Sequence, residues 1–167
     1  MKLLKELRDS EKDLAEEDYE IRESARAVVI RDGKIAILSV SKYGYHKLPG
    51  GGLEKEEDVR STLLREIKEE TGCDAEIIEE IGKIVEYKSK FKQKQISYCY
   101  LVKVKSYSPN LRFTDNEKSA GFSLLWEKID NAIKLFENDA PLDYFGNFIR
   151  NRDLIFLKEA KTLSRSF

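Results

Sequence analysis

The chain has 167 residues, with 30 Lys and Arg against 31 Asp and Glu, a formal net charge of -1 and 41% hydrophobic residues. This length is enough for one domain with a real core. The balanced charge excludes a global electrostatic attraction to nucleic acid or to an anionic membrane. We therefore expect a single domain, with neither DNA nor a membrane as a partner.

Residues 1–24 are dense in charge, with scattered Leu and Ile. Their pattern allows a short helix, an extra edge strand or a mobile arm, and the residues do not decide among these. No apolar run of signal-peptide length opens the chain, and no later run approaches the roughly 18 apolar residues of a membrane span. We expect a cytoplasmic protein in which Cys73 and Cys99 remain thiols and form neither a disulfide nor a zinc site.

A β-hairpin is predicted at residues 25–41, ARAVVIRDGKIAILSVS. Two runs rich in β-branched residues flank the dipeptide formed by Asp32 and Gly33, and Asp-Gly between such runs favours a tight hairpin turn. The next segment, KYGYHKLPGGG, is marked as a loop by its Gly and Pro residues.

A helix is predicted from about residue 57 to residue 71, followed by Gly72, which is placed to end it. One side of this helix is apolar and carries Leu63, Leu64 and Ile67. The next two segments, 75–90 and 95–106, are rich in β-branched and aromatic residues and predict two long strands joined near residues 91–95. Gly82 is expected to mark a bulge or a bend in the first of them.

The end of the chain predicts a short strand at 121–126, a short helix at 127–138 and a last helix at 142–161. The last helix has an apolar side formed by Phe148, Ile149, Leu154, Ile155 and Leu157. Strands and helices are mixed without a regular βαβ alternation, which favours an α+β fold, or a mixed sheet with helices on its faces. Residues 25–167 would form this domain.

Three glutamates share another side of the first predicted helix. Glu66, Glu69 and Glu70 are spaced i, i+3 and i+4, so they project together. Glu66 and Glu70 repel each other at i,i+4, and the helix dipole disfavours negative charge near the C-terminus. Glu70→Gln removes one of these charges, so the metal-free variant is expected to be as stable as the parent or marginally more stable. The cluster is either a solvated face or a site for a hard cation such as Mg²⁺ or Mn²⁺.

Three consecutive glycines, Gly50, Gly51 and Gly52, precede this helix. They are explained by an ordinary turn after Pro49, or by φ angles and close backbone approaches that other residues forbid. A carbonyl turned toward a cation is one such use.

The segment from Gly51 to Cys73 resembles the Nudix box, G-x(5)-E-x(7)-R-E-U-x-E-E-x-G-U, in which U is aliphatic. The matching positions are Gly51, Glu57, Arg65, Glu66, Ile67, Glu69, Glu70 and Gly72. Cys73 is the one departure, at a place where the pattern has Ile, Leu or Val. The preceding KLPGG and the hairpin are also similar to the family, so the resemblance covers about residues 25–126.

The resemblance implies a Nudix-type α/β/α sandwich around a mixed sheet, and Mg²⁺- or Mn²⁺-dependent hydrolysis of a nucleoside diphosphate linked to another moiety, X. It also implies that the metal ligands are Glu66, Glu69, Glu70 and the carbonyl of Gly50. Glu57 would act through the metal's hydration shell or by pairing with Arg65, which would orient the carboxylates. The general base would come from the box or from a later loop, where Glu117 stands at the matching place.

Aromatic and basic residues ahead of Pro49 are candidates for substrate binding. These are Tyr43, Tyr45, His46 and Lys47. The tyrosines would stack on a base, His46 would form a pocket wall and Lys47 would meet a phosphate; packing and solvent exposure are the alternative explanations for the same residues.

Lys88, Lys90, Lys92 and Lys94 alternate along the predicted strands, so an extended chain would place all four on one side. Such a patch is either a solvated hairpin tip or a binding surface that attracts a polyphosphate or an RNA 5′ end. The expected partner is a nucleotide-type small molecule, with hydrolysis of RNA 5′ ends and a non-catalytic nucleotide sensor as alternatives. X and a possible homodimer stay open.

Overall fold

The computed structural model describes residues 1–10, Ala15 and residues 18–163. Its strands are β1 (Leu3–Arg8), β2 (Glu20–Arg31), β3 (Lys34–Val40), β4 (Tyr45–Lys47), β5 (Cys73–Lys88), β6 (Gln93–Tyr107) and β7 (Phe122–Glu127). Its helices are α1 (Val59–Thr71), α2 (Asp115–Ser119), α3 (Ile129–Asn138) and α4 (Tyr144–Leu163). In the described part of the chain, no helix is long and apolar enough to cross a membrane.

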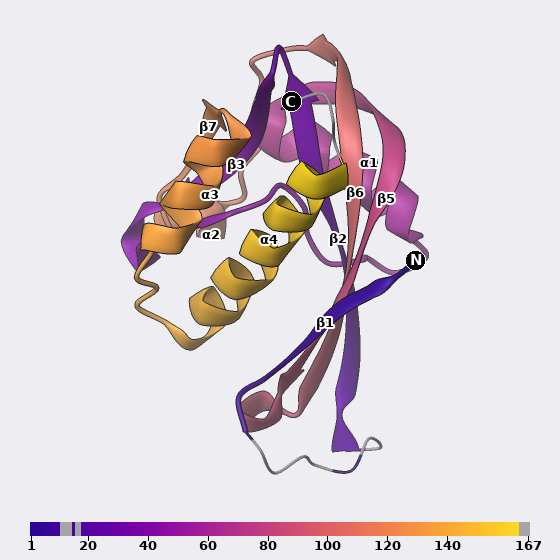
Figure 1. The fold of residues 1–167 in the computed structure, drawn as a ribbon, viewed down its shortest axis with the longest axis vertical. Coiled ribbons are helices and arrows are strands. Elements are labelled where there is room, and N and C mark those ends of the chain that lie inside the picture. Colours follow the sequence, from indigo (N-terminus) through magenta and orange to yellow (C-terminus); the bar gives the residue numbers. More distant parts are fainter. Residues whose placement is uncertain (11–14, 16–17, 164–167) are drawn as a thin grey trace.

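The strands form one seven-stranded sheet in the order β1-β5-β6-β2-β3-β4, with β7 paired to β3. Strands β1 and β5 are parallel, as are β2 and β6, and the other pairs are antiparallel. Helix α1 lies behind the sheet in Figure 1, while α3 and α4 lie in front of it. The sequence-based prediction of an α+β fold, with a mixed sheet between helices, is confirmed.

The predicted hairpin is present, and its turn has the conformation that Asp-Gly favours. Asp32 and Gly33 have φ angles of 52° and 70°, which join β2 to β3 through two residues. Only two residue pairs connect these strands, Ile30 with Ile35 and Arg31 with Lys34. Strand β3 then diverges to pair with β4 and β7, which leaves the remaining edge of β2 open to another partner.

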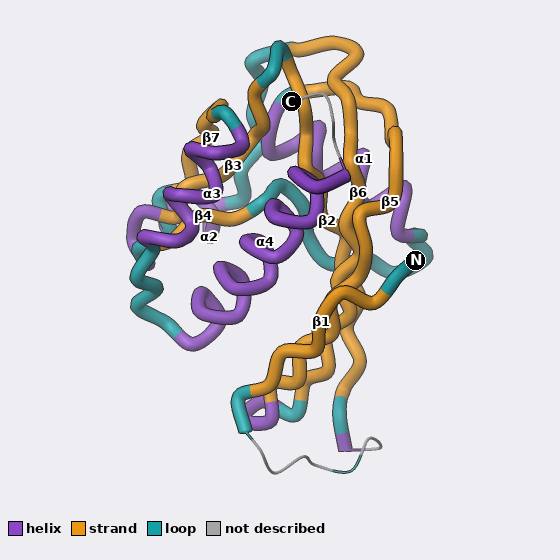
Figure 2. The backbone as a smooth tube through the Cα atoms, in the orientation of Figure 1, coloured by secondary structure: helices purple, strands orange, loops and turns teal. Residues whose placement is uncertain are grey.

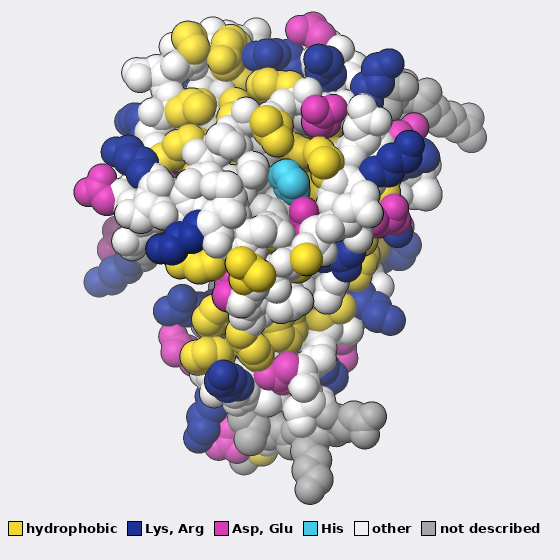
Figure 3. Space-filling view, turned by 90° about the vertical axis from the view of Figure 1, so that its left-hand side faces the viewer, with side chains coloured by type: hydrophobic (Ala, Val, Ile, Leu, Met, Phe, Trp, Pro, Cys, Tyr) yellow, Lys and Arg dark blue, Asp and Glu magenta, His cyan; other side chains and the backbone are white. Residues whose placement is uncertain are grey.

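Charged side chains of both signs are interspersed on the face of the molecule shown in Figure 3. This mixture agrees with the balanced composition of 30 basic and 31 acidic residues. Both cysteines are buried free thiols, and Cys73 belongs to a different hydrophobic cluster from Cys99.

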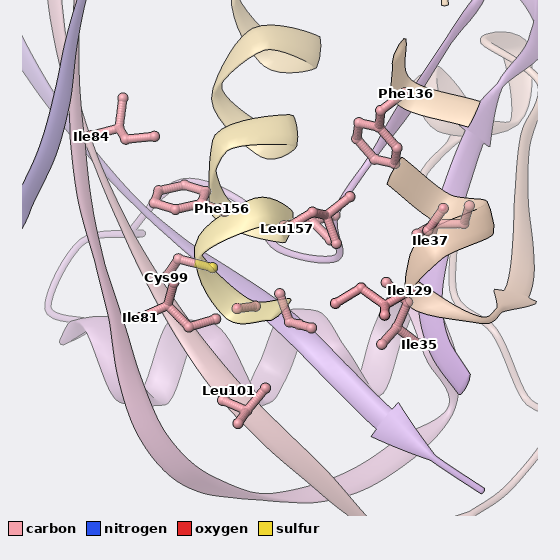
Figure 4. Packing of buried hydrophobic residues seen from close by; sticks show 14 residues of the cluster. Ile35, Ile37, Ile81, Ile84, Cys99, Leu101, Ile129, Phe136, Phe156 and Leu157 are labelled. Carbon is pink, nitrogen blue, oxygen red and sulfur yellow. The ribbon is translucent and has the colours of Figure 1, made fainter. Parts of the chain in front are cut away.

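Two hydrophobic cores lie on opposite faces of the sheet. The core under α1 includes Leu63 and Ile67, while the core under α3 and α4 includes Phe136, Phe156 and Leu157. Figure 4 shows Phe156 and Leu157 directed from α4 toward the strands. Each helix therefore covers its face through its own apolar side.

The apolar side predicted for the last helix is only partly right. The buried residues of α4 are Gly146, Phe148, Arg152, Asp153, Phe156, Leu157 and Ala160. Arg152 donates through Nε to Asp153 Oδ1 at 2.7 Å and through Nη1 to Glu86 Oε2 at 3.3 Å. These ion pairs allow two charged residues to occupy core-facing positions that a hydrophobicity pattern assigns to solvent.

The segment 1–24, for which the sequence left three structures open, contributes an edge strand. Strand β1 pairs with β5, and β2 already begins at Glu20, so the boundary placed after residue 24 falls inside a strand. Residues 11–14 and 16–17 of this segment lie outside the described part of the chain.

Gly82 lies at a register shift between β5 and β6, as the sequence predicted, with a φ angle of 153°. A Cβ atom there would lie 2.6 Å from Cγ of Leu4 in β1. We predict that Gly82→Ala lowers the free energy of unfolding by about 1–3 kcal/mol and accelerates amide hydrogen exchange in β1. Gly33→Ala, at a position with nothing within 4 Å of the added Cβ, is the matched control and should leave exchange in β1 unchanged. Equal exchange in β1 of both variants would contradict the contact with Leu4.

Candidate functional site

The glycine-rich loop after β4 lies along the open edge of β2 (Figure 2). The backbone N–H groups of Ala25 and Ala27 donate to the carbonyls of Gly51 and Pro49, both at 3.0 Å. The loop therefore completes the hydrogen bonding of β2 where β3 has diverged.

Two of the three glycines are required by this close approach. Gly50 has a φ angle of 133°, and a Cβ atom there would lie 2.1 Å from the carbonyl oxygen of Ala25. A Cβ atom on Gly51 would lie 2.1 Å from Glu66 Oε1. The prediction that these glycines permit unusual φ angles or close approaches is confirmed for both.

Helix α1 carries the glutamates and has well-defined ends. The Asp58 side chain accepts from the backbone N–H of Ser61 in a capping box, which starts the helix at Val59. Gly72 ends it in the left-handed conformation, with a φ angle of 70°, as predicted. The three glutamates lie in the C-terminal half of the helix, and two of them, Glu66 and Glu70, lie against the glycine-rich loop.

Glu70 is buried, with 2% of its surface exposed. Its Oε1 accepts from Lys47 Nζ at 2.7 Å, and its Oε2 accepts from the backbone N–H of Gly50 at 2.6 Å. Lys47 Nζ also donates to the carbonyl of Gly50 at 3.2 Å. Burial raises the pKa of the Glu70 carboxyl, and the Lys47 ammonium opposes this rise.

This environment reverses the expected stability of Glu70→Gln. The sequence analysis considered only the repulsion between Glu70 and its neighbouring glutamates. In the structure, Glu70 is paired with the buried ammonium of Lys47. Removing its charge would leave Lys47 buried without a counter-ion, which is strongly unfavourable.

Arg65 binds the carboxylates of Glu57, Glu66 and Glu69. It donates to both oxygens of Glu57, at 2.8 Å and 3.0 Å, and to Glu66 at 2.9 Å and Glu69 at 3.3 Å. The Arg65 hydrogen bonds, followed by the Thr62 hydroxyl, lower the pKa of Glu57 to about 2. The pairing of Glu57 with Arg65, one of the two predicted alternatives, is present.

The oxygens near the loop are suited to a hard cation, although they do not form a complete metal site. Glu66 lies against Gly51 and Glu70 against Gly50, while Glu69 faces Arg65 and Arg112. Among the described residues, no group of three or more His, Cys, Asp or Glu side chains is arranged to hold a metal ion. The donors that converge are therefore two carboxylates and one carbonyl, all oxygen ligands of the kind Mg²⁺ prefers.

The four predicted substrate-binding residues occupy different environments. Tyr43 lines a cavity of about 380 Å³ together with Glu117 and Phe122. Tyr45 is buried. Its ring packs so closely against Gly146 that a Cβ atom on that glycine would lie 2.7 Å from it. Tyr43 thus lines a cavity, whereas Tyr45 packs in the interior. Lys47 points inward to Glu70, and its binding of a phosphate stays a prediction.

Glu117 is a capping residue of α2, a short helix that the sequence did not reveal. Its Oε2 accepts from the backbone N–H of Thr114 at 2.7 Å and from the Thr114 hydroxyl at 2.9 Å. The carboxylate nevertheless lines the same cavity as Tyr43. Its role as a general base stays a prediction.

Two aspartates that the sequence analysis missed bind the backbone of strand β4 and of the residue that follows it, at the end of the sheet order. Asp139 accepts from the backbone N–H of His46 at 2.7 Å and lies 2.8 Å from its ring Nδ1. Asp153 accepts from the backbone N–H of Leu48 at 2.8 Å. The sequence held one signal for this role: Asp153 lies between Phe148 and Phe156 on the apolar side of the last helix, where a charged residue is unexpected.

The predicted one-sided stripe of four lysines is wrong. Ser89–Phe91 form a 3-10 turn that interrupts the strand alternation, and Lys92 has a φ angle of 49°. Lys88 is 2% exposed and lies 3.5 Å from Glu86. The basic patch that favoured an RNA 5′ end is therefore absent in the expected form.

The comparisons with known proteins identify the family. The family model described as "NUDIX domain" matches residues 21–145, about three quarters of the chain, which is more than the sequence resemblance covered. The chain belongs to the NUDIX domain family.

Individual relatives are distant. The human diphosphoinositol polyphosphate phosphohydrolase 3-beta is 26% identical over 113 residues, which are 67% of this chain and 65% of the relative. The match thus spans slightly less than two thirds of that protein. A NUDIX hydrolase from Nitrosomonas europaea has a TM-score of 0.65 at 17% identity, covering 87% of this chain and 92% of that structure. An ADP-ribose pyrophosphatase from Streptococcus suis has a TM-score of 0.53 at 19% identity, covering 87% of this chain and 95% of that structure.

The lowered pKa of Glu57 predicts a window of pH-dependent stability. Its folded-state pKa of about 2 lies below the ordinary value of 4.5, so the stabilisation is fully present above the ordinary value and is lost as the pH falls toward 2. We predict that Glu57→Gln removes this part of the pH dependence, measured as the difference between urea unfolding curves from pH 6 to pH 2, an interval set by the unfolded and folded pKa values. Glu79→Gln, at an exposed position, is the control; a difference curve as flat for Glu57→Gln as for this control would contradict the prediction.

The contacts of Asp139 with His46 and of Asp153 with Leu48 should contribute differently to the free energy of unfolding. Asp153→Asn keeps one acceptor but removes the charge beside the buried Arg152, so we predict a loss of about 2–4 kcal/mol of unfolding free energy. Asp139 contacts His46 and no buried guanidinium. The Asp139→Asn variant should therefore lose less unfolding free energy. Chemical denaturation measures both losses, and hydrogen exchange follows the Leu48 amide for Asp153→Asn and the His46 amide for Asp139→Asn. Equal losses of unfolding free energy would show that Arg152 does not depend on Asp153.

Proposed function

We propose that this protein is a Mg²⁺- or Mn²⁺-dependent pyrophosphohydrolase that cleaves a pyrophosphate bond in a nucleoside diphosphate linked to X, by attack of water at phosphorus. One observation carries the proposal. Within the described residues, the ion pairs of this cluster join five carboxylates to three cations, Arg65, Lys47 and Arg112; the carboxylates are those of Glu54, Glu57, Glu66, Glu69 and Glu70. The deficit of two positive charges next to a backbone carbonyl suits a divalent cation.

The residues that would hold the ion are Glu66, Glu70 and the Gly50 carbonyl, with Glu69 joining them if it turns from Arg65. When bound, a divalent ion neutralises charge on the diphosphate and lowers the pKa of a bound water. Arg65 fixes the directions of Glu66 and Glu69 through hydrogen bonds of 2.9 Å and 3.3 Å. A carboxylate that stays ionised takes the proton of the attacking water.

The cavity lined by Tyr43, Glu117 and Phe122 is the proposed position of part of the substrate. It adjoins the carboxylates through Phe122, whose ring centroid lies 5.0 Å from Lys47 Nζ. An aromatic wall beside this position supports a planar base or another ring as a substrate group. A cytoplasmic setting, with both cysteines as buried thiols, belongs to the same proposal.

The names of the relatives widen the substrate class to be tested. One is a diphosphoinositol polyphosphate phosphohydrolase and another an ADP-ribose pyrophosphatase, and both names denote substrates with a diphosphate group. A panel of ADP-ribose, a nucleotide sugar, a dinucleoside polyphosphate, a capped RNA and a diphosphoinositol polyphosphate would define X by its products. Tight binding without any turnover would instead favour the nucleotide sensor.

We predict that hydrolysis stops in excess EDTA and returns with Mg²⁺, and that Glu70→Gln lowers turnover by at least about a hundredfold. In EDTA the variant should be less stable than the parent by roughly 3 kcal/mol, since Lys47 loses its buried partner. The melting-temperature increase on adding Mg²⁺ should disappear, because ligand binding to the native state causes it.

Glu76→Gln, in an exposed ion pair with Lys105, is the matched control and should behave like the parent. Glu117→Gln separates the two sources of the general base. A large loss of turnover with an unchanged Mg²⁺-induced melting shift would assign the base to Glu117, and parental turnover would assign it to the box. Full activity in EDTA would contradict the proposed function.

A further inference from the structure

We propose that Lys47 is a built-in competitor of the divalent cation: its ammonium holds Glu70 and the Gly50 carbonyl together in the metal-free protein and leaves them when the ion binds. The inference rests on the proposed function, because it assumes that Glu70 and Gly50 are ligands. Lys47 was a candidate for binding phosphate in the sequence, and the structure assigns it a different contact.

The position of the ammonium carries the proposal. Lys47 Nζ lies 2.7 Å from Glu70 Oε1 and 3.2 Å from the Gly50 carbonyl oxygen, which are two of the proposed ligand oxygens. The Lys47 side chain is only 10% exposed and that of Glu70 only 2%, so water screens the site weakly. Two cations that share these oxygens would repel each other across a few ångströms in this buried environment.

The backbone around Lys47 is fixed on both sides. Asp139 binds the N–H of His46 and Asp153 binds the N–H of Leu48, while β4 pairs with β3 on its other edge. The displacement must therefore be a rotation of the Lys47 side chain rather than a shift of the strand. Phe122, whose ring centroid is 5.0 Å from Nζ, lines the neighbouring cavity and offers a direction for this movement.

The type of residue also fits an exchangeable cation. Lysine has a compact ammonium on a flexible stem, whereas arginine presents a rigid fork that binds carboxylates through two parallel bonds. Arg65, which holds Glu57 through such a fork and makes no contact with Gly50, is expected to stay in place. The free energy of Mg²⁺ binding to the parent would then contain the cost of displacing Lys47, which weakens the affinity.

The test compares Mg²⁺ binding by the parent and by Lys47→Met, measured by isothermal titration calorimetry and by melting curves without substrate. Removing the competing ammonium should tighten the Mg²⁺ dissociation constant by at least about tenfold. The metal-free variant should melt below the parent, because Glu70 loses its counter-ion, and its Mg²⁺-induced increase should be larger. Lys88→Met removes another buried lysine that lies 3.5 Å from a carboxylate; it should destabilise the protein without changing Mg²⁺ affinity.

A measurement on the parent protein covers the case in which Lys47→Met does not fold. In ¹⁵N-lysine-labelled protein, the ammonium signal of Lys47, assigned by its loss in Lys47→Arg, should shift or vanish on Mg²⁺ saturation, while that of Lys88 should not change. An unchanged Lys47 signal at saturation, or an equal or weaker Mg²⁺ affinity in Lys47→Met, would overturn the competition and leave the proposed hydrolysis standing. Absence of Mg²⁺ binding in both proteins, with hydrolysis that persists in EDTA, would overturn both proposals.

Discussion

The site depends on how closely the loop after β4 approaches the open edge of β2. Because β2 and β3 share only two residue pairs, the N–H groups of Ala25 and Ala27 need other acceptors, which the loop carbonyls supply. Gly50 can occupy its position only because it lacks a Cβ atom. In that conformation its N–H donates to Glu70 and its carbonyl accepts from Lys47. Completing the sheet therefore directs two polar backbone groups to the candidate site.

Helices from opposite faces of the sheet fix this one loop. Helix α1 binds it through Glu70 at Gly50, and α4 binds it through Asp153 at Leu48. Both carboxylates are buried and each has a basic partner, Lys47 or Arg152. Buried ion pairs are weak sources of stability because desolvation offsets their attraction. Their contribution here is to orient the loop, since each aspartate or glutamate contacts a backbone N–H as well as a cation.

The sequence predicted the elements that have a strong period or a specific turn. The hairpin at Asp32 and Gly33, the helix ending at Gly72 and the bulge at Gly82 all follow from local chemistry. Strand β4 and helix α2 were missed because three and five residues are too few to show a period. The lysine stripe failed because a 3-10 turn broke the alternation that it assumed.

The contacts that define the site join residues far apart in the chain. Lys47 and Glu70 are 23 residues apart, and Leu48 and Asp153 are 105 apart. Local patterns carry no information on such pairs. They also assign charged residues to solvent, which is why Glu70, Arg152 and Asp153 were not expected to be buried. The motif located the glutamates, but only the fold revealed which cation each one contacts.

These partners explain how three glutamates can stand together near a helix C-terminus, where the helix dipole disfavours negative charge. Arg65 neutralises part of the cluster from the same helix, and Lys47 reaches Glu70 from β4. The two cations are not equivalent, since Arg65 donates hydrogen bonds to three carboxylates while Lys47 donates to one carboxylate and a carbonyl. Releasing Arg65 would disrupt the whole cluster, whereas releasing Lys47 frees only the oxygens beside Gly50. The structure thus separates a cation that maintains the carboxylate arrangement from one that can be exchanged for a divalent ion.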